Sequence, residues 1–169
     1  MPDRPAHWWR RYVNTPIARE VSSLTRHFDR VIQWMARPED TGLLLDRIEA
    51  PAKTRLDGDT LPDLSHEGGL RTAILLNGVF NHHFDVQALL SDAHPRLART
   101  ARLVVVLYNP YFGWLYRLAN RWGIRHPAQP ATFITRTDLA NLARLSGFET
   151  TRLRPAVYSP GGSSVWARS

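Results

Sequence analysis

Residues 72–85, with the sequence TAILLNGVFNHHFD, carry the clearest fold signal in the chain. The apolar run Thr72–Leu76 is short, and the turn-forming pair Asn77-Gly78 follows it directly. A run of this length, ended by such a pair, predicts a buried β-strand. A second run, Leu103–Leu107 (LVVVL), is rich in β-branched residues, which predicts a strand covered on both faces, as in a parallel sheet.

Helical spacing of apolar residues is found before and between these runs. Thr15 as N-cap and Pro16 in the first turn predict a helix that continues to Met35 and ends before Pro38 and Gly42. Residues 43–48 fit either a helix or a short strand, and residues 53–56 fit a short strand. A helix is predicted between the two apolar runs from the spacing of Val86, Leu89, Leu90, Ala93 and Leu97.

The region after residue 107 predicts two further helices and a strand. The first helix spans residues 112–119, and the second begins at Thr137 as N-cap, with Asp138 in its first turn. Gly147 is expected to end this second helix in a left-handed conformation, with Phe148 making the accompanying apolar contact. Residues 148–152 then alternate as in a strand.

This alternation of strands and helices predicts an α/β layered sheet built from right-handed crossovers. The length of 169 residues fits one domain. We expect an N-terminal aromatic and basic segment over residues 1–15, the α/β domain over residues 16–158, and a flexible tail over residues 159–169.

Composition excludes several classes of protein. Hydrophobic residues make up 43% of the chain and charged residues 22%, which is typical of a globular domain and not of a disordered one. The absence of cysteine excludes a disulfide scaffold, a thiol nucleophile and a cysteine-ligated zinc site. No signal peptide or membrane-spanning run is evident, so we expect a cytoplasmic protein.

The net charge of +7 permits a nucleic-acid-binding domain as one interpretation. The arginines are spread along the chain and form no runs, so a general arginine-rich composition is favoured and nucleic acid is not the expected partner. Trp114, Tyr116 and Arg117 combine aromatic and basic side chains, which leaves peripheral membrane contact open as an alternative. A buried aromatic face with solvated arginines is the simpler interpretation.

Three motifs that follow one another along the chain resemble those of class I S-adenosylmethionine-dependent methyltransferases. Gly58-Asp59-Thr60-Leu61-Pro62 resembles the family's "GDA…LP" turn after the third strand. Residues 77–85 resemble its "S/N-N-V-L-E-H-L-x-D" segment after the fourth strand, and residues 147–149 resemble its "G-F-E" before the sixth. The resemblance covers about residues 54–155. It implies a three-layer Rossmann-like, mostly parallel sheet that is incomplete, and methyl transfer to a small-molecule, sugar or lipid acceptor.

The same resemblance implies a set of site residues. S-adenosylmethionine would be the cofactor, and the acceptor would lie near Tyr108, Asn109 and Tyr111. His82 is a candidate catalytic base, although a histidine in the core or at the start of a helix is the favoured interpretation. The implied cofactor-binding residues are Gly58, Asp59, Thr60, Leu61, Asn77 and Gly78. Simpler interpretations exist, because Asp59 also fits a surface turn and Asn77-Gly78 also fits a plain strand end. No metal site is predicted, since the adjacent His82 and His83 point apart on any regular element.

One motif of the family is missing. Its first strand ends in a glycine-rich turn, "D/E-x-G-x-G-x-G", whose backbone approaches the methionine end of the cofactor. Residues 37–57 contain one glycine, Gly42, and too little chain for a strand, a helix and a second strand. Two alternatives therefore stay open besides methyl transfer: a non-catalytic remnant that binds a partner or forms a homodimer through an exposed sheet edge, and a basic nucleic-acid-binding domain.

Overall fold

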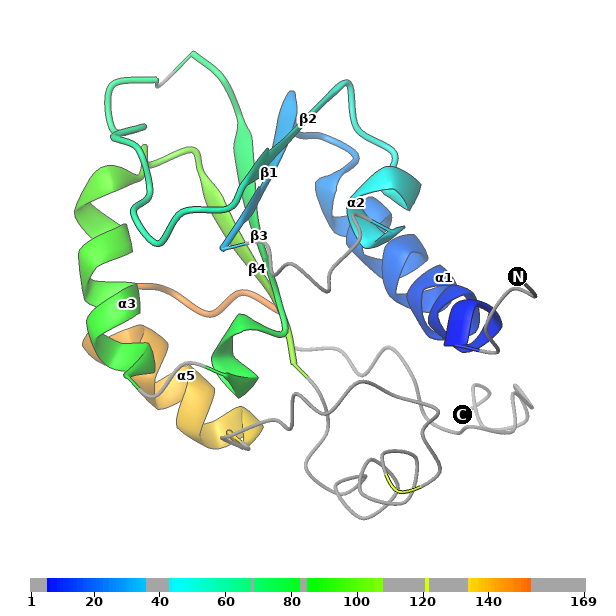
Figure 1. Cartoon of the computed structure of the whole chain (residues 1–169). Helices are drawn as coiled ribbons and strands as arrows, with labels where there is room; N and C mark the ends of the chain where they lie inside the picture. Colours follow the sequence, from blue (N-terminus) through cyan, green and yellow to red (C-terminus); the bar gives the residue numbers. More distant parts are fainter. Residues whose placement is uncertain are drawn as a thin grey trace, which may run out of the picture.

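The computed structural model describes residues 6–35, 43–67, 69–82, 85–107, 121 and 134–152, with the side chains of helix α1 described from Thr15 onward. A four-stranded, wholly parallel sheet with the strand order β2-β1-β3-β4 forms the centre of this part of the chain (Figure 1). The strands are β1 (Arg30–Trp34), β2 (Ala52–Leu56), β3 (Thr72–Asn77) and β4 (Arg102–Val106). The strands predicted over residues 53–56, 72–76 and 103–107 are thus confirmed.

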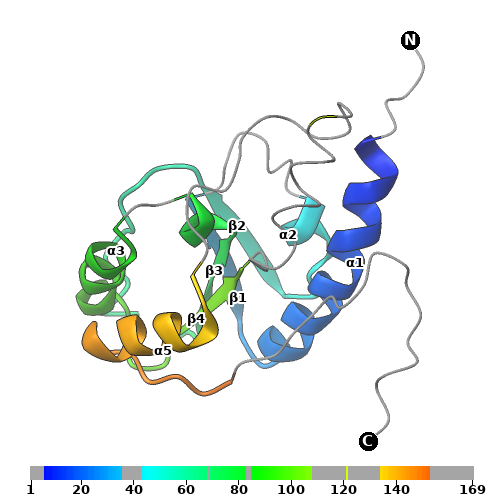
Figure 2. The same cartoon turned by 90° about the horizontal axis from the view of Figure 1, so that it is seen from below.

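Helices cover both faces of the sheet. Helices α1 (Ala6–Thr25) and α2 (Leu43–Arg47) lie on one face, and α3 (Val86–Ala93) and α5 (Arg136–Leu145) lie on the other (Figures 1 and 2). Two short 3-10 helices follow β3 and α3: η1 (Val79–Asn81) and η2 (His94–Arg96). The predicted three-layer α/β architecture is confirmed.

Each face of the sheet has its own hydrophobic core, because successive side chains of a strand point to opposite faces. The α1-side cluster joins Val31 of β1 and Leu75 of β3 to Val21 of α1 and Leu44 of α2. The α3-side cluster joins Ile32, Trp34, Ile74 and Leu76 to residues of α3, η1 and α5. The central strand β3 is buried on both sides from Thr72 to Leu76, which explains why its sequence is apolar throughout.

The helix predicted from Thr15 to Met35 is wrong at both ends. Helix α1 already begins at Ala6, so Thr15 is not its N-cap and Pro16 lies inside it. The helix ends at Thr25, and β1 begins at Arg30. Val31 and Ile32 fit helical spacing as well as a buried strand, and pairing of β1 with both β2 and β3 decides for the strand.

The chain contains a strand–helix–strand unit that was not predicted from the sequence. With β1 placed at Arg30–Trp34, the ambiguous residues 43–48 supply helix α2, and β2 follows in parallel beside β1. A complete strand–helix–strand unit therefore fits within residues 30–56. The sequence did not predict this unit, because the residues of β1 were assigned to the preceding helix.

The predictions around α5 hold in part. Its N-cap is Thr135 and not Thr137: the Thr135 hydroxyl accepts from the backbone N–H of Asp138 at 3.2 Å, and the Asp138 carboxylate accepts from the N–H of Thr135 at 3.3 Å. Gly147 has φ 86°, which confirms the left-handed end of the helix. The strand predicted over residues 148–152 is wrong, because these residues form no strand in the structure. The helix predicted over residues 112–119 lies outside the described residues.

Candidate functional site

The strand order places a topological switch point between β1 and β3. From β1 the chain passes to β2 on one side, then returns to β3 and β4 on the other side. In open parallel α/β sheets, ligands bind outside the carboxyl ends of the strands at such a point. We call this region the carboxyl edge: Met35 after β1, residues 57–61 after β2, and Asn77-Gly78 at the end of β3.

Asn77 and Gly78, both predicted from the sequence, lie at this switch point. Asn77 is half-buried and aligns with Val106 of β4, and the N–H of Gly78 donates to the Val106 carbonyl at 2.9 Å. Gly78 has φ 67° and starts η1. Because this left-handed conformation favours glycine, the glycine is required by the backbone turn that ends β3.

The turn after β2 contains the other predicted cofactor-binding residues. Gly58, Asp59 and Thr60 are exposed, and a Cβ atom added at Gly58 would meet nothing within 4 Å. The Leu61 side chain is fully buried in the α3-side cluster, and its carbonyl accepts from the Arg96 guanidinium at 3.2 Å. Leu61 therefore anchors the turn, while Asp59 is the accessible acidic group. Since β1 lies between β2 and β3, the two strands that lead to this turn and to Gly78 are about 10 Å apart.

Met35, which the sequence analysis did not single out, completes the carboxyl edge. It has φ 54° and is the one residue with a side chain and a positive φ among those the structure describes. Met35 is half-buried and packs against the α3-side cluster. The preceding Trp34 is fully buried, and its indole N–H has no hydrogen-bond acceptor within the described ranges. The pairing of β1 with β3 shows that Met35 follows a strand. The sequence alone did not predict this, because the apolar residues between 16 and 35 follow helical spacing.

The structure describes the predicted catalytic residue but not the predicted acceptor-binding residues. His82 directly follows η1, is half-buried, and donates its backbone N–H to the Val79 carbonyl at 2.9 Å. Its use as a base stays a prediction. Tyr108, Asn109 and Tyr111 lie outside the described residues, so their contact with an acceptor stays a prediction too. Within the described ranges, no three His, Asp or Glu side chains gather as metal ligands.

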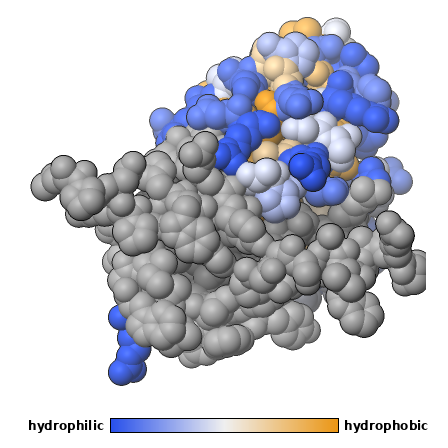
Figure 3. All heavy atoms as spheres, turned by 90° about the vertical axis from the view of Figure 1, so that its right-hand side faces the viewer, coloured by the Kyte–Doolittle hydropathy of each residue, from blue (hydrophilic) through white to orange (hydrophobic). Residues whose placement is uncertain are grey.

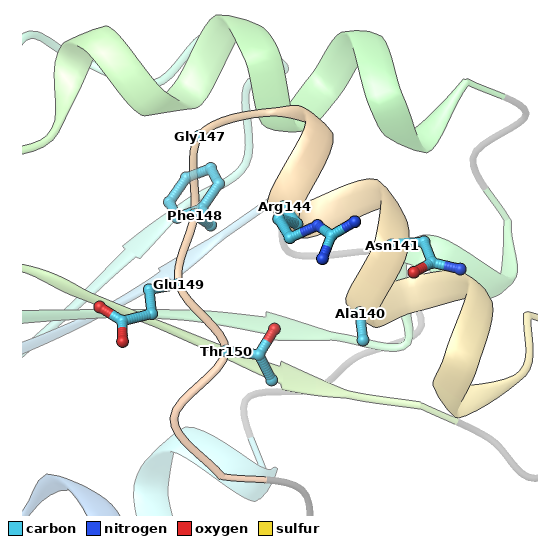
Figure 4. A pocket seen from close by; sticks show the side chains of 7 residues that line it. All are labelled: Ala140, Asn141, Arg144, Gly147, Phe148, Glu149 and Thr150. Carbon is cyan, nitrogen blue, oxygen red and sulfur yellow. The ribbon is translucent and has the colours of Figure 1, made fainter.

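Among the hollows on the surface of the described part are two that lie away from the carboxyl edge. One, of about 470 Å³, lies at the end of α5, where the Glu149 carboxylate points away from the Arg144 guanidinium (Figure 4). Gly147 in its wall adjoins His94, which precedes β4, so this hollow is near the amino ends of the strands.

The second hollow, of about 520 Å³, lies between the ends of α1 and α2 and is lined in part by Arg19, Arg26 and Arg47. These helix ends lead back to the starts of β1 and β2, so it also lies near the amino ends of the strands. On this side of the molecule, the described side chains are mainly hydrophilic (Figure 3). Because α/β sheets bind ligands at the opposite ends of their strands, neither hollow is the candidate site.

Two carboxylates of the described chain have lowered pKa values. The Arg71 side chain donates to Asp29 and lowers the pKa of that carboxyl, and in return Asp29 raises the pKa of Arg71. This ion pair, at 3.1 Å, joins the residues that precede β1 and β3. The Ser65 hydroxyl donates to Asp63 at 2.6 Å and lowers its pKa. Neither carboxylate belongs to the carboxyl edge.

The carboxyl edge fits S-adenosylmethionine in part. The turn after β2 has open space around Gly58 and an accessible carboxylate at Asp59, whereas Gly78 after β3 is buried and Asn77 beside it is half-buried. Of the turn after β1 the structure describes Met35 alone, a residue with a side chain at a place where nucleotide-binding sheets favour glycine.

Comparison with known proteins finds a similar structure but no match by sequence. No protein-family model matches the chain, and no curated protein matches it. Among solved structures, the chain is similar to a SAM-dependent methyltransferase of Thermotoga maritima, described as a possible histamine N-methyltransferase. The TM-score is 0.57 at 15% identity, over 85% of this chain and 74% of that one. None of the described helices is both long and apolar enough to span a membrane. The chain has a Rossmann-like fold of the kind found in class I methyltransferases.

Proposed function

We propose that this chain binds S-adenosylmethionine at the carboxyl edge and takes part in methyl transfer, in the cytoplasm, to a small-molecule, sugar or lipid acceptor. The observation that supports it is the convergence of the turns after β2 and β3 on the switch point of a methyltransferase-like sheet. The ordered motifs from Gly58 to Glu149 and the similarity to a methyltransferase structure add further support.

In this proposal each residue of the carboxyl edge has a defined task. The Asp59 carboxylate accepts hydrogen bonds from the sugar or base of the ligand, and the half-buried Asn77, which ends β3 before the buried Gly78, contacts the ligand from the side of β3. When bound, the cofactor supplies an activated methyl group, so the protein mainly has to align the donor with the acceptor. His82 removes a proton from the acceptor where the reaction requires it.

Binding of S-adenosylhomocysteine, measured by isothermal titration calorimetry, tests the cofactor site. Loss of a hydrogen bond to a charged group costs about 1.5–3 kcal/mol, so Asp59→Asn should weaken binding roughly 10- to 100-fold. Glu149→Gln is the matched control, since it neutralises an exposed carboxylate at the α5 hollow. Absence of binding to folded wild-type protein at millimolar ligand, or equal losses in both variants, would contradict the proposal.

A second candidate function, a non-catalytic methyltransferase-like protein that binds a partner, is favoured by one observation. Met35, a residue with a side chain, follows β1 directly, where nucleotide-binding sheets favour a glycine. Incubation with S-adenosylmethionine and panels of small-molecule, sugar and lipid acceptors separates the two functions. Formation of S-adenosylhomocysteine that depends on an acceptor supports methyl transfer, whereas binding without turnover supports the second candidate.

A further inference from the structure

The hollow between α1 and α2 combines positive charge with hydroxyl groups. Its volume of about 520 Å³ is within the range of sites for small molecules. Arg19, Arg26 and Arg47 line it together with three hydroxyl side chains, and Glu49 is the one carboxylate among the described residues in its wall. Guanidinium and hydroxyl groups are donors that bind phosphate oxygens, so this lining favours an anionic ligand.

The two arginines that α1 contributes lie on one face of the helix. Arg19 and Arg26 are seven residues apart, which is two helical turns and about 10 Å along the axis. Ser22 and Ser23 lie between them and also line the hollow. A ligand that carries two anionic groups can therefore contact both arginines at once, with the hydroxyl groups between them.

Neither of these two arginines has an acidic partner. Within the described ranges, Arg19 and Arg26 form no ion pair with a carboxylate, and both are exposed. The Nε of Arg26 donates to Nε2 of His27 at 2.8 Å, which leaves the two terminal nitrogens of this guanidinium for a ligand. An anion from solution thus meets donors that no carboxylate of the described chain already occupies.

Hydrogen bonds between its two walls shape the hollow before any ligand binds. The Arg47 guanidinium, at the end of α2, donates to the Thr15 hydroxyl of α1. The backbone N–H of Glu49 donates to the Ser22 hydroxyl at 3.0 Å. These contacts hold the third guanidinium beside α1, so less conformational freedom is lost when a ligand binds.

We propose that this hollow binds a diphosphate group, with Arg19 and Arg26 each pairing with one phosphate and Arg47 adding positive charge from the opposite wall. The planar guanidinium suits this task because it pairs with phosphate oxygens through two parallel hydrogen bonds. The described residues that line the hollow include no aromatic ring to stack on a base, so the diphosphate itself is the recognised group. The hollow lies near the amino ends of the strands, which makes this site independent of the carboxyl edge.

Isothermal titration calorimetry with pyrophosphate at low ionic strength tests this inference. Arg19→Gln combined with Arg26→Gln should weaken binding at least roughly 10-fold, because charge-assisted hydrogen bonds to both phosphates are lost. Glu49→Gln should tighten binding about 2- to 3-fold, since it removes a negative charge from the wall. Arg144→Gln is the matched control: it removes the same charge from the α5 hollow on the other face of the sheet (Figure 1) and should keep Kd within about 2-fold of wild type.

ADP distinguishes the two sources of a diphosphate group. Equal affinity for ADP and pyrophosphate assigns the site to the diphosphate alone, and tighter binding of ADP identifies a nucleotide; either result supports the inference when the double variant loses both ligands. S-adenosylhomocysteine should not displace pyrophosphate, so each site can fail without the other.

Three results would overturn the inference. The first is no binding of pyrophosphate or ADP to folded wild-type protein at millimolar ligand. The second is an equal loss of affinity in Arg144→Gln and in the double variant. The third is a single-stranded RNA that binds more tightly than pyrophosphate at the same phosphate concentration and is released by the double variant, which would assign this surface to nucleic acid.

Discussion

Substitution of Gly147 by alanine should destabilise the protein by about 2 kcal/mol, and the structure gives the reasons. At φ 86° an L-residue loses about 1–2 kcal/mol. The new Cβ would also lie 3.0 Å from Nε2 of His94, so the imidazole must move. That ring stacks edge-to-face on Phe148 at 5.0 Å, a contact worth about 0.5–1.5 kcal/mol. Restriction of the unfolded chain by alanine returns about 0.4–1 kcal/mol.

Thermal unfolding followed by circular dichroism, together with urea denaturation, measures this effect. For a chain of this size, about 2 kcal/mol corresponds to a decrease in Tm of about 4–8 °C. Gly58→Ala is the matched control, because its Cβ meets nothing within 4 Å and its φ is not positive; it should leave Tm unchanged or raise it slightly. In a His94→Ala background, Gly147→Ala should cost less, since the ring is gone. A Gly147→Ala protein within 0.5 kcal/mol of wild type would refute the reasoning.

Three further predictions concern other parts of the fold. The pKa of Asp29 is lowered below its usual value of 3.8, so its ion pair with Arg71 stabilises the fold above about pH 4 and loses this effect as the pH falls further. The difference in Tm between wild type and Asp29→Asn should therefore shrink in acid, and a constant difference from pH 7 to pH 2.5 would contradict this. Thr135→Ala removes the N-cap of α5 and should cost about 0.5–2 kcal/mol in urea denaturation; an unchanged midpoint would show that the cap is dispensable. Among the described strands, β2 is an exposed edge, and its positive side chains Lys53 and Arg55 oppose pairing with another edge. Joint replacement of both by threonine should therefore strengthen the homodimer that the sequence leaves open as an alternative, as measured by light scattering; weaker association would argue against this edge as the interface.

The strands that could be predicted from the sequence are those whose burial leaves an unambiguous pattern. Strand β3 is covered on both faces, so it is apolar throughout and ends at a turn that requires glycine. Strand β1 is equally buried but includes Gln33, and its apolar residues continue the helical spacing of α1. Local sequence cannot separate these alternatives, because the decision depends on pairing with two strands that are distant in the chain.

The candidate site likewise contains one residue that could be predicted from the sequence and one that could not. Gly78 could be anticipated, since a glycine after a strand indicates a conformation that other residues avoid. Met35 could not, because methionine has no preference for a left-handed backbone and the surrounding structure imposes it. The residue of the carboxyl edge with the unusual backbone conformation is thus the one without a local sequence signal.

The most direct test of the proposed ligand site is a titration with S-adenosylhomocysteine followed by ¹H–¹⁵N NMR spectroscopy. If the site is the carboxyl edge, the largest shifts should occur at the backbone amides of Asp59, Thr60 and Gly78. The amides of Arg144 and Thr150 in the α5 hollow should stay in place. Shifts concentrated in that hollow, or no shifts at millimolar ligand, would contradict the account.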